Sequence, residues 1–206
     1  MTGVQTCALP IYENDFELQD WVSFYGSLTE ELPKNMPESL GAEMFIVVYV
    51  DADHATDKVT RKSRTGFIVL LNGAPIYWYS KKQAGIETSS YGSEFVAMRT
   101  CCEYLKGLRY RLRMMGIPVN HPCFVYGDNK SVLVNCSKPD SLLKKKAHGI
   151  SYHYVREGVA KNEWRLAYCN TEDNFADPMT KNLPAGANRY RKIRGIMYDI
   201  YPEGQY

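Results

Sequence analysis

Apolar residues gather in short runs along the first half of the chain, each bounded by polar or turn-forming residues. Phe45–Val50, Thr65–Leu71 and Ala74–Ser80 are runs of this kind, and their length and their β-branched and aromatic content indicate strands. The dipeptide Asn72-Gly73, between the last two runs, is a strong signal for a tight hairpin turn. The three segments therefore predict an antiparallel meander that begins near Glu43.

A longer pattern follows, in which apolar positions recur every three or four residues up to about Met115. Ser89 or Ser90 can cap the start of this predicted helix, and the turn that begins at Gly116 ends it. The apolar stripe consists of Ala97, Met98, Cys101, Leu105, Leu108 and Leu112. Glu94 lies on the same stripe, so the helix is expected to carry one acid toward the core.

Strand and helix signals alternate through the second half of the chain. His121–Gly127 and Glu163–Cys169 are the predicted strands, and the predicted helices are Asn129–Cys136, Leu142–Lys161, Glu172–Asn182 and Asn188–Ile200. This order of elements predicts an α/β fold, built on a five-stranded mixed sheet that is flanked by helices. The strand Phe45–Val50 is expected at the centre of the sheet, with the strand that precedes Asp128 beside it.

The two ends of the chain lack this regular pattern and set the expected domain boundaries. Residues 1–11 read MTGVQTCALPI, which resembles the conceptual translation of a sequencing-library adapter, so we leave them out of the predicted fold. Residues 12–42 contain one short helical piece, Phe16–Phe24, and then a polar stretch that we interpret as a connector from a missing upstream domain. The folded domain is expected over residues 43–184, and a basic, tyrosine-rich tail over residues 185–206.

Amino-acid composition restricts the possible functions less than the hydrophobic pattern does. The chain has 206 residues, of which 45% are hydrophobic and 23% charged, as in ordinary soluble globular proteins. The formal net charge is only +2, so any nucleic-acid binding must come from local basic clusters. No apolar run approaches the ~20 residues of a membrane span. The six cysteines form no CxxC pair and mostly lie in apolar runs, which indicates buried thiols in a reducing intracellular compartment.

Four acidic residues occupy positions where a carboxylate is costly unless a positive charge compensates it. Asp51 and Asp128 follow apolar strands, Glu94 lies on the apolar stripe, and Asp177 lies in a polar turn near the C-terminus. Because side chains alternate along a strand, Asp53 is expected to point toward the same place as Asp51. Oxygen ligands of this kind suit Mg²⁺ or Mn²⁺. Asp177 alone would be interpreted as a solvated acid, but the four together predict a divalent-metal site.

Seven short segments around these acids follow one another at a characteristic spacing between Glu43 and Pro184. They are YVDADHA (Tyr49–Ala55), TRKSRTG (Thr60–Gly66), IYWYSKKQ (Ile76–Gln83), SSYGSEFVA (Ser89–Ala97), YGDN (Tyr126–Asn129), KKKAHGISYHYVRE (Lys144–Glu157) and FADPMTKNLP (Phe175–Pro184). Each segment alone is weak, but the ordered set resembles the ribonuclease H domain of copia-type LTR retrotransposon polyproteins. The resemblance implies an RNase H-like fold placed after a reverse transcriptase.

The resemblance also implies an activity, which is endonucleolytic hydrolysis of the RNA strand of RNA–DNA hybrids. Two Mg²⁺ ions ~3.5–4 Å apart would assist it, with Mn²⁺ able to substitute. In the family pattern Asp51 bridges both ions, Glu94 and Asp128 complete one metal shell, and Asp128 or Asp177 completes the other. The implied partners are the RNA–DNA hybrid and the upstream reverse transcriptase domain, with no membrane and no small-molecule cofactor. The implied location is a retroelement particle in the cytoplasm.

Substrate contacts are predicted beside the acids. Residues that flank the carboxylates could bind the 2′-hydroxyls that distinguish RNA from DNA; these are Ser89, Ser90, Asn129 and Ser131. For Ser89 or Ser90 a role as helix cap is equally consistent with the sequence. Polar residues in charged turns could hold phosphates of the hybrid, or could simply be solvated; these are Arg61, Lys81, Lys82 and Gln83. Arg109, Arg111 and Arg113 are weaker candidates, because their spacing spreads them around a helix.

Proton transfer is the least determined part of the prediction. Many ribonucleases H have a mobile histidine shortly before the last aspartate, but here residues 170–176 contain Thr171 and no histidine. His148 and His153 lie earlier, on a predicted helix, and we interpret them as packing residues, with an approach to the site from another element as the alternative. The missing histidine suggests a different or slower proton-transfer arrangement.

Two other functions stay open on the sequence alone. One is a catalytically decayed module that binds or tethers hybrids in a remnant of a retroelement, although the presence of all four acids disfavours it. The other is an integrase-like or resolvase-like nuclease of the same broad fold, against which the TRKSRTG and YWYSKKQ segments count. Metal-dependent cleavage separates the leading hypothesis from the first, and preference for hybrid over duplex DNA separates it from the second.

Overall fold

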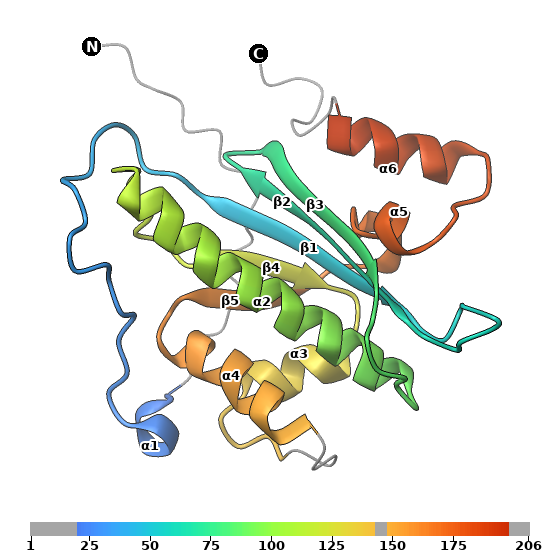
Figure 1. Ribbon diagram of the computed structural model, residues 1–206, viewed down its shortest axis with the longest axis horizontal. Helices are drawn as coiled ribbons and strands as arrows, with labels where there is room; N and C mark the ends of the chain where they lie inside the picture. Colours follow the sequence, from blue (N-terminus) through green and yellow to red (C-terminus); the bar gives the residue numbers. More distant parts are fainter. Residues whose placement is uncertain (1–19, 143–147, 198–206) are drawn as a thin grey trace.

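The structure, a computed structural model, describes residues 20–142 and 148–197. Its five strands form one sheet in the order β3-β2-β1-β4-β5 (Figure 1). The strands are β1 (Ile46–Asp53), β2 (Arg64–Leu71), β3 (Ala74–Lys82), β4 (Cys123–Gly127) and β5 (Trp164–Tyr168). Strand β1 pairs antiparallel with β2 and parallel with β4, and β4 pairs parallel with β5. The predicted mixed sheet with the first strand at its centre is confirmed.

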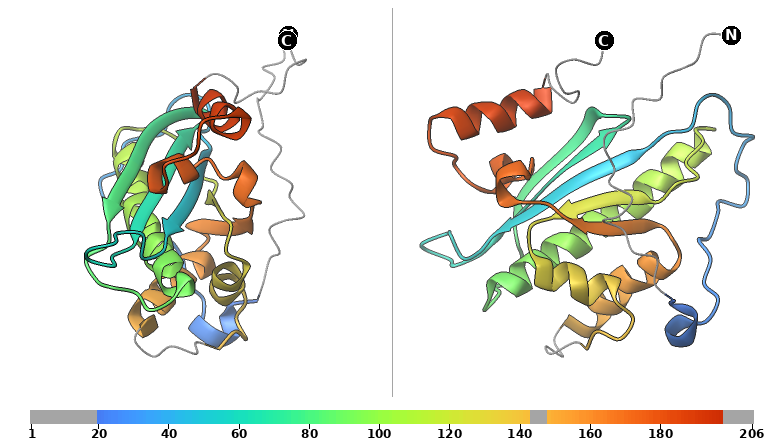
Figure 2. Two further views of the ribbon diagram at one scale, coloured as in Figure 1. Left: turned by 90° about the vertical axis from the view of Figure 1, so that its right-hand side faces the viewer. Right: turned by 180° about the vertical axis from the view of Figure 1, so that it is seen from behind.

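Helices cover both faces of this sheet (Figures 1 and 2). They are α1 (Val22–Tyr25), α2 (Ser90–Met114), α3 (Lys130–Ser137), α4 (Gly149–Ala160), α5 (Asp177–Thr180) and α6 (Ala187–Met197), with a 3₁₀ turn η3 (Thr171–Asp173) before α5. Helices α2, α3 and α4 share one hydrophobic core with the sheet, whereas α5 and α6 pack on the opposite face. None of the helices in the described ranges is long and apolar enough to cross a membrane.

Alternation along β1 explains why both faces are covered. Val48 and Val50 pack in the core beneath α2, while Val47 and Tyr49 belong to the cluster on the side of α5 and α6. All six residues of the predicted apolar stripe of α2 are buried. On the other face, Gly66 of β2 allows α5 to approach closely, because a Cβ atom there would come within 3 Å of side chains of that helix.

The hairpin between β2 and β3 forms as its turn residues predict. Asn72 and Gly73 both adopt a positive φ, 47° and 86°, which is the backbone shape that a two-residue turn of this kind requires. Asn72 also accepts a hydrogen bond from the backbone N–H of Phe45 through its Oδ1, at 2.7 Å. The turn therefore also ties the hairpin to the residue before β1.

The connector contacts the core in its described part, which the sequence did not indicate. Trp21 is buried beneath the Arg156 guanidinium, whose carbon lies 4.9 Å from the ring centroid. Farther along, Glu30 pairs with Arg109 at 2.7 Å and with Arg113 at 2.6 Å. Burial alone would raise the pKa of Glu30, but hydrogen bonds from the two arginines hold it at about 2. These arginines therefore serve the fold and do not face a nucleic acid.

The predicted helices of the C-terminal half differ from the structure mainly at their ends. Helix α4 begins at Gly149, while residues 143–147 of the predicted helix lie outside the described residues. The single helix expected at Glu172–Asn182 is interrupted, because the side chain of Asn174 accepts a hydrogen bond from Ala176 N and donates one to Val50 O, each at 3.0 Å. Of the predicted helix Phe16–Phe24, only the end falls within the described residues, as part of α1.

The cysteines in the described part of the chain are free, as expected. Cys101, Cys102, Cys123 and Cys136 are buried, and Cys169 is partly exposed. Burial raises the pKa of each of these thiols. The four buried cysteines therefore behave as small apolar side chains in the core.

Candidate active site

Parallel pairing of β1 and β4 brings two acids to the same edge of the sheet. Val50 is paired with Gly127, the last pair between the two strands, so Asp51 and Asp128 follow at the same level. Glu94 reaches this edge from the first turns of α2, where Ser89 caps the helix. One carboxylate oxygen from each acid lies within 4.8 Å of the other two. The structure therefore brings together three of the four predicted metal ligands.

Mutual repulsion and burial strain this group of carboxylates. Asp51 is only 1% exposed, and burial raises its pKa despite the nearby Lys181 ammonium and a hydrogen bond from Thr180. The pKa of Glu94 is raised to about 9, first by burial and then by the charges of Asp51 and Asp128. A cation among the three acids would relieve both effects, and hard oxygen donors suit Mg²⁺ or Mn²⁺. The donor set therefore fits the predicted ion.

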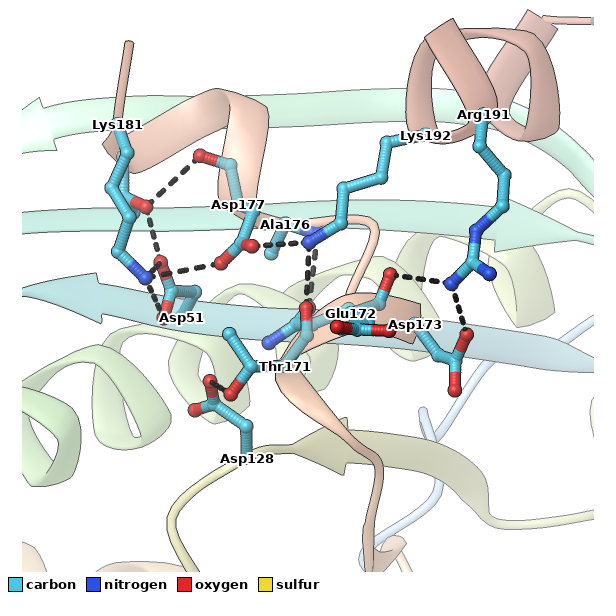
Figure 3. Close-up of polar contacts among 12 residues, drawn as sticks. Asp51, Asp128, Thr171, Glu172, Asp173, Ala176, Asp177, Lys181, Arg191 and Lys192 are labelled. Atoms are coloured by element: carbon cyan, nitrogen blue, oxygen red, sulfur yellow. Dashed lines mark hydrogen bonds and ion pairs between the residues drawn. The ribbon is translucent and has the colours of Figure 1, made fainter. Parts of the chain in front are cut away.

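Asp177, the fourth acid, is held by two lysines. It begins α5 and is 4% exposed. Its Oδ1 lies 3.1 Å from Lys181 Nζ and its Oδ2 pairs with Lys192 Nζ (Figure 3). The Lys181 ammonium also lies 3.3 Å from Asp51 Oδ2, so it bridges the two acids. Burial works against the charge on Lys181, but Asp51 and Asp177 outweigh it and raise its pKa above the ordinary value.

Two threonines hold the acids, and sequence reasoning missed both. Thr180 Oγ1 donates a hydrogen bond to Asp51 Oδ2, and Thr171 Oγ1 donates to Asp128 Oδ2 at 2.8 Å. Thr180 and Lys181 lie three and four residues after Asp177, a spacing that places neighbours on one helix face and could have indicated them. No local spacing could have indicated Thr171, because 43 residues separate it from Asp128.

Comparison with known proteins places this geometry in a family. No protein-family model matches the chain. The Retrovirus-related Pol polyprotein from transposon RE2 of Arabidopsis thaliana is 34% identical over 155 residues, which cover 74% of this chain and 11% of the relative. The corresponding RE1 polyprotein of the same plant is 33% identical over 143 residues, 69% of this chain and 10% of the relative. The chain is a homologue of copia-type Pol polyproteins.

This Pol homologue spans only about a tenth of the length of these relatives. Among solved structures, the crystal structure of LC11-RNase H1 in complex with RNA/DNA hybrid matches it with a TM-score of 0.53. The match covers 66% of this chain and 93% of that one, at 14% sequence identity. At that level of identity the likeness concerns the fold alone, and the predicted ribonuclease H fold is confirmed.

The polar residues predicted to bind 2′-hydroxyls are all at helix starts in the Pol homologue. Ser89 Oγ accepts a hydrogen bond from Gly92 N at 3.2 Å, so its role as helix cap is confirmed. Asn129 caps α3 in the same way, through Val132 N at 3.2 Å. Ser90 and Ser131, in the first turns of α2 and α3, are exposed. Contact with a 2′-hydroxyl stays a prediction for all four.

The predicted phosphate contacts divide between exposed and buried side chains. Arg61, Lys81 and Lys82 are exposed, and Lys82 pairs with Asp57. Gln83 is only 6% exposed, and its Nε2 donates to Thr65 Oγ1 at 3.0 Å and to Ser93 O at 2.8 Å. It ties the end of β3 to β2 and α2. This inward position does not fit the phosphate contact that we predicted for Gln83.

A polar cavity of about 640 Å³ opens beside Lys181. It is lined by the β1–β2 loop, by β2 and β3 and by α5, with Asp53, Lys62, Arg64, Ser80, Lys82 and Lys181 among its residues. Arg64 donates a hydrogen bond to the neutral Ser80 Oγ at 3.2 Å. Asp53, expected near the site, lies on this wall. Several cationic side chains therefore face a space that adjoins the acids.

The two histidines on and before α4 have packing partners. His148 Nε2 lies 3.3 Å from Glu87 Oε2, and its ring centroid lies 5.8 Å from that of Phe95. The Nδ1 of His153 and the hydroxyl of Tyr25 are 2.7 Å apart, in a hydrogen bond between α4 and the connector. These contacts favour the packing interpretation over a role in proton transfer.

Proposed function

We propose that this chain hydrolyses the RNA strand of RNA–DNA hybrids as the nuclease module of a Pol polyprotein. The observation that carries the proposal is the convergence of Asp51, Glu94 and Asp128 within 4.8 Å, at one end of an RNase H-like sheet. Two further facts support it. The homologues are Pol polyproteins, and a protein of the same fold has been crystallised with an RNA/DNA hybrid.

The acids of the site are the groups that would hold the metal ions. Asp51, Glu94 and Asp128 would hold one Mg²⁺, and Asp51 with Asp177 would hold a second, with Mn²⁺ able to replace either. Bound there, the ions would supply an activated water and would stabilise charge on the phosphate. Thr180 and Thr171 keep Asp51 and Asp128 oriented through hydrogen bonds. Because the three acids already converge in the fold, little conformational entropy would be lost when an ion binds.

The remaining residues of the site would bind the nucleic acid. Lys181 has a 35% exposed side chain at the wall of the polar cavity, so its ammonium can turn from the acids toward a phosphate. Lys62 and Arg64 line the same cavity and would attract the next phosphates along the strand. Ser90 and Ser131, exposed beside the acids, are available for 2′-hydroxyls. Together they would position RNA across the three carboxylates.

The test of the proposal is cleavage of a labelled RNA–DNA hybrid by the full chain, with Mg²⁺, with Mn²⁺ and with EDTA. Matched duplex RNA and duplex DNA serve as control substrates. Loss of the hybrid's RNA strand alone, and only with a divalent ion, is the expected result. Cleavage of duplex DNA at a similar rate, or cleavage in EDTA, would contradict the proposal.

A second candidate function is hybrid binding without cleavage. The two lysines that pair with Asp177 favour this candidate. Their charges already compensate Asp177, which would otherwise be a ligand of the second metal ion. A folded protein that binds the hybrid tightly in a filter or anisotropy assay, but leaves its RNA strand intact with either ion, would favour this candidate.

A further inference from the structure

Lys192 is a buried lysine on α6, in the segment that the sequence predicted as a basic tail. Its side chain is only 1% exposed, a position that a lysine seldom occupies unless an opposite charge compensates it. Its Nζ pairs with Asp177 Oδ2 and donates a hydrogen bond to Thr171 O at 2.6 Å (Figure 3). The neighbouring Arg191 is 58% exposed and pairs with Asp173 at the surface. Lys192 therefore belongs to the interior of the site.

Packing fixes the position of this lysine. Ile196, one turn later on α6, is 8% exposed in the cluster that lies over the sheet. Gly195 lies so close to Phe175 that a Cβ atom on it would come within 3 Å of the ring. Arg191, just before Lys192, is bonded to Glu172 O and Asp173, so contacts on both sides of Lys192 hold α6 in place and keep this lysine enclosed beside Asp177.

The same lysine reaches a second acid through Thr171. The carbonyl of Thr171 accepts from Lys192 Nζ, and the hydroxyl of Thr171 donates to Asp128 Oδ2. The lysine thus holds the turn that orients Asp128 while it binds Asp177 directly. One side chain from the C-terminal helix connects two of the four acids.

Asp177 has an ammonium partner on each carboxylate oxygen, and the two partners differ in exposure. Lys181 is 35% exposed and can withdraw into the polar cavity. Lys192 is enclosed and remains. A divalent ion that approaches Asp177 therefore displaces one positive charge but still meets the other.

We propose that Lys192 is a positioning residue that fixes Asp177 through one oxygen and weakens the binding of a divalent ion on that side of the site. The C-terminal helix would then set how readily the Asp51–Asp177 side takes up metal, while the Asp51–Glu94–Asp128 side is unaffected. The inference rests on the proposed function in one respect, because it takes the four acids as the metal-binding set.

The test is Mn²⁺ binding by the full chain without nucleic acid, measured by calorimetry and by the electron paramagnetic resonance of free Mn²⁺. Lys192→Met keeps most of the apolar stem and removes the charge. It is expected to tighten the weaker class of Mn²⁺ sites by about tenfold or more, since a unit charge a few ångströms away repels the ion strongly in a buried site. Arg191→Ala, on the same helix, removes an exposed ion pair and should leave binding as in the wild type.

The sign of the effect separates this role from simple structural support. A damaged site would bind Mn²⁺ more weakly, so unchanged or weaker binding by folded Lys192→Met would overturn the proposal. Thermal unfolding verifies that each variant is folded. If Lys192→Met does not fold, Lys192→Gln retains a hydrogen-bond donor for Thr171 O and should show the same tightening.

Asp177→Asn completes the test. In that background the tightening caused by Lys192→Met should vanish, because the two residues act through one contact. Tightening that persists would show that the charge does not act through Asp177 and would also overturn the proposal. Hybrid cleavage is not part of the measurement, so a failure of the proposed function would leave the outcome interpretable.

Discussion

Two buried charge clusters in this molecule have opposite balances. Behind α2, Glu30 alone faces Arg109 and Arg113, and its pKa is held at about 2. At the end of β1 and β4, four acids face two lysines, and the pKa of Glu94 is raised to about 9. Both clusters join segments far apart in the sequence. Both clusters thus contain buried charges, and they differ in the ratio of acidic to basic side chains.

The difference teaches how a functional cluster can be recognised. In the Glu30 cluster both carboxylate oxygens have arginine partners, and Arg109 and Arg113 also donate to the backbone carbonyls of His121 and Val119. The hydrogen bonds of this cluster are thus satisfied within the chain, and its contribution is to the fold. The acid cluster keeps an excess of negative charge within a few ångströms, which the fold alone does not explain. Buried acids with raised pKa values and too few cationic partners therefore indicate a binding site for a ligand. A buried acid that is fully paired with cations does not.

The largest effect is expected from Asp51→Asn. Hybrid cleavage should fall on the order of 10³-fold or more, because the substitution removes a charge from the centre of the metal-binding set. The fold should remain, since Asp51 is an acid whose burial already disfavours its charge. Cleavage assays with thermal unfolding check both parts. A folded variant that still cleaves the hybrid would contradict a role for Asp51 in catalysis, and the acid cluster could then be structural like the Glu30 cluster.

Glu30→Gln addresses the other cluster. It should destabilise the protein by about 3 kcal/mol, because it leaves the buried charge of Arg109 without its partner. Cleavage per folded molecule should not change. Urea unfolding measures the loss, and Glu31→Gln, at the exposed neighbouring position, is the matched control. A loss of cleavage out of proportion to the unfolded fraction would show that the two clusters are coupled.

Gly66→Ala tests how closely the acid cluster depends on α5. A Cβ atom at this position would come within 3 Å of Met179 and Thr180, so the helix that carries Asp177 and Lys181 must shift. We expect a loss of about 1–3 kcal/mol in stability and about a tenfold slower cleavage. Gly85→Ala, where the added atom meets open space, should have neither effect. Normal cleavage by Gly66→Ala would mean that the position of α5 is not critical.

The two clusters should also differ in their pH dependence. Glu94 has a raised pKa of about 9, so its contribution to stability is present below about pH 4.5 and is lost as the pH rises toward 9. Glu30 has a lowered pKa of about 2, so its contribution is present above about pH 4.5 and is lost as the pH falls toward 2. Thermal unfolding in EDTA should show both slopes.

Each slope has its own control. Glu94→Gln should flatten the decline between pH 4.5 and 9, and Glu30→Gln should flatten the decline below pH 4.5. A divalent ion should stabilise the wild type most at the alkaline end, because it favours the ionised form of Glu94. Asp51, whose pKa burial also raises, contributes to the same slope, so part of it should remain in Glu94→Gln. An alkaline slope that is unchanged in Glu94→Gln would contradict the assignment to Glu94.

The sequence predicted those features of the fold that depend on local pattern. Short apolar runs located the strands, Asn72-Gly73 located the hairpin, and an acid on an apolar stripe singled out Glu94. Asp51 and Asp128 could be placed together because each follows an apolar strand. These inferences need only the periodicity of one element and the pairing rules for strands.

The parts that the sequence could not predict depend on which distant segment covers an element. The apolar stripe of α2 shows that one face is buried, but it does not show that Glu30, 79 residues before Arg109, pairs with the arginines. Lys192 fell in the predicted basic tail, for which the sequence did not indicate whether it packs on the core, and it lies inside the site. Gln83 follows two exposed lysines, and no local pattern shows that its side chain turns inward, where its Nε2 donates to Thr65 Oγ1 and Ser93 O.

The hydrogen bond between Thr180 and Asp51 spans 129 residues, and that between Asn174 and Val50 spans 124. During synthesis, which runs from the N-terminus, β1 is made long before the segment that holds its acidic end. The meander and α2 can pack early, since their contacts are closer in the chain. The acidic end of the sheet is therefore the last region to be completed, and a growing chain carries its core before it carries a finished acid cluster.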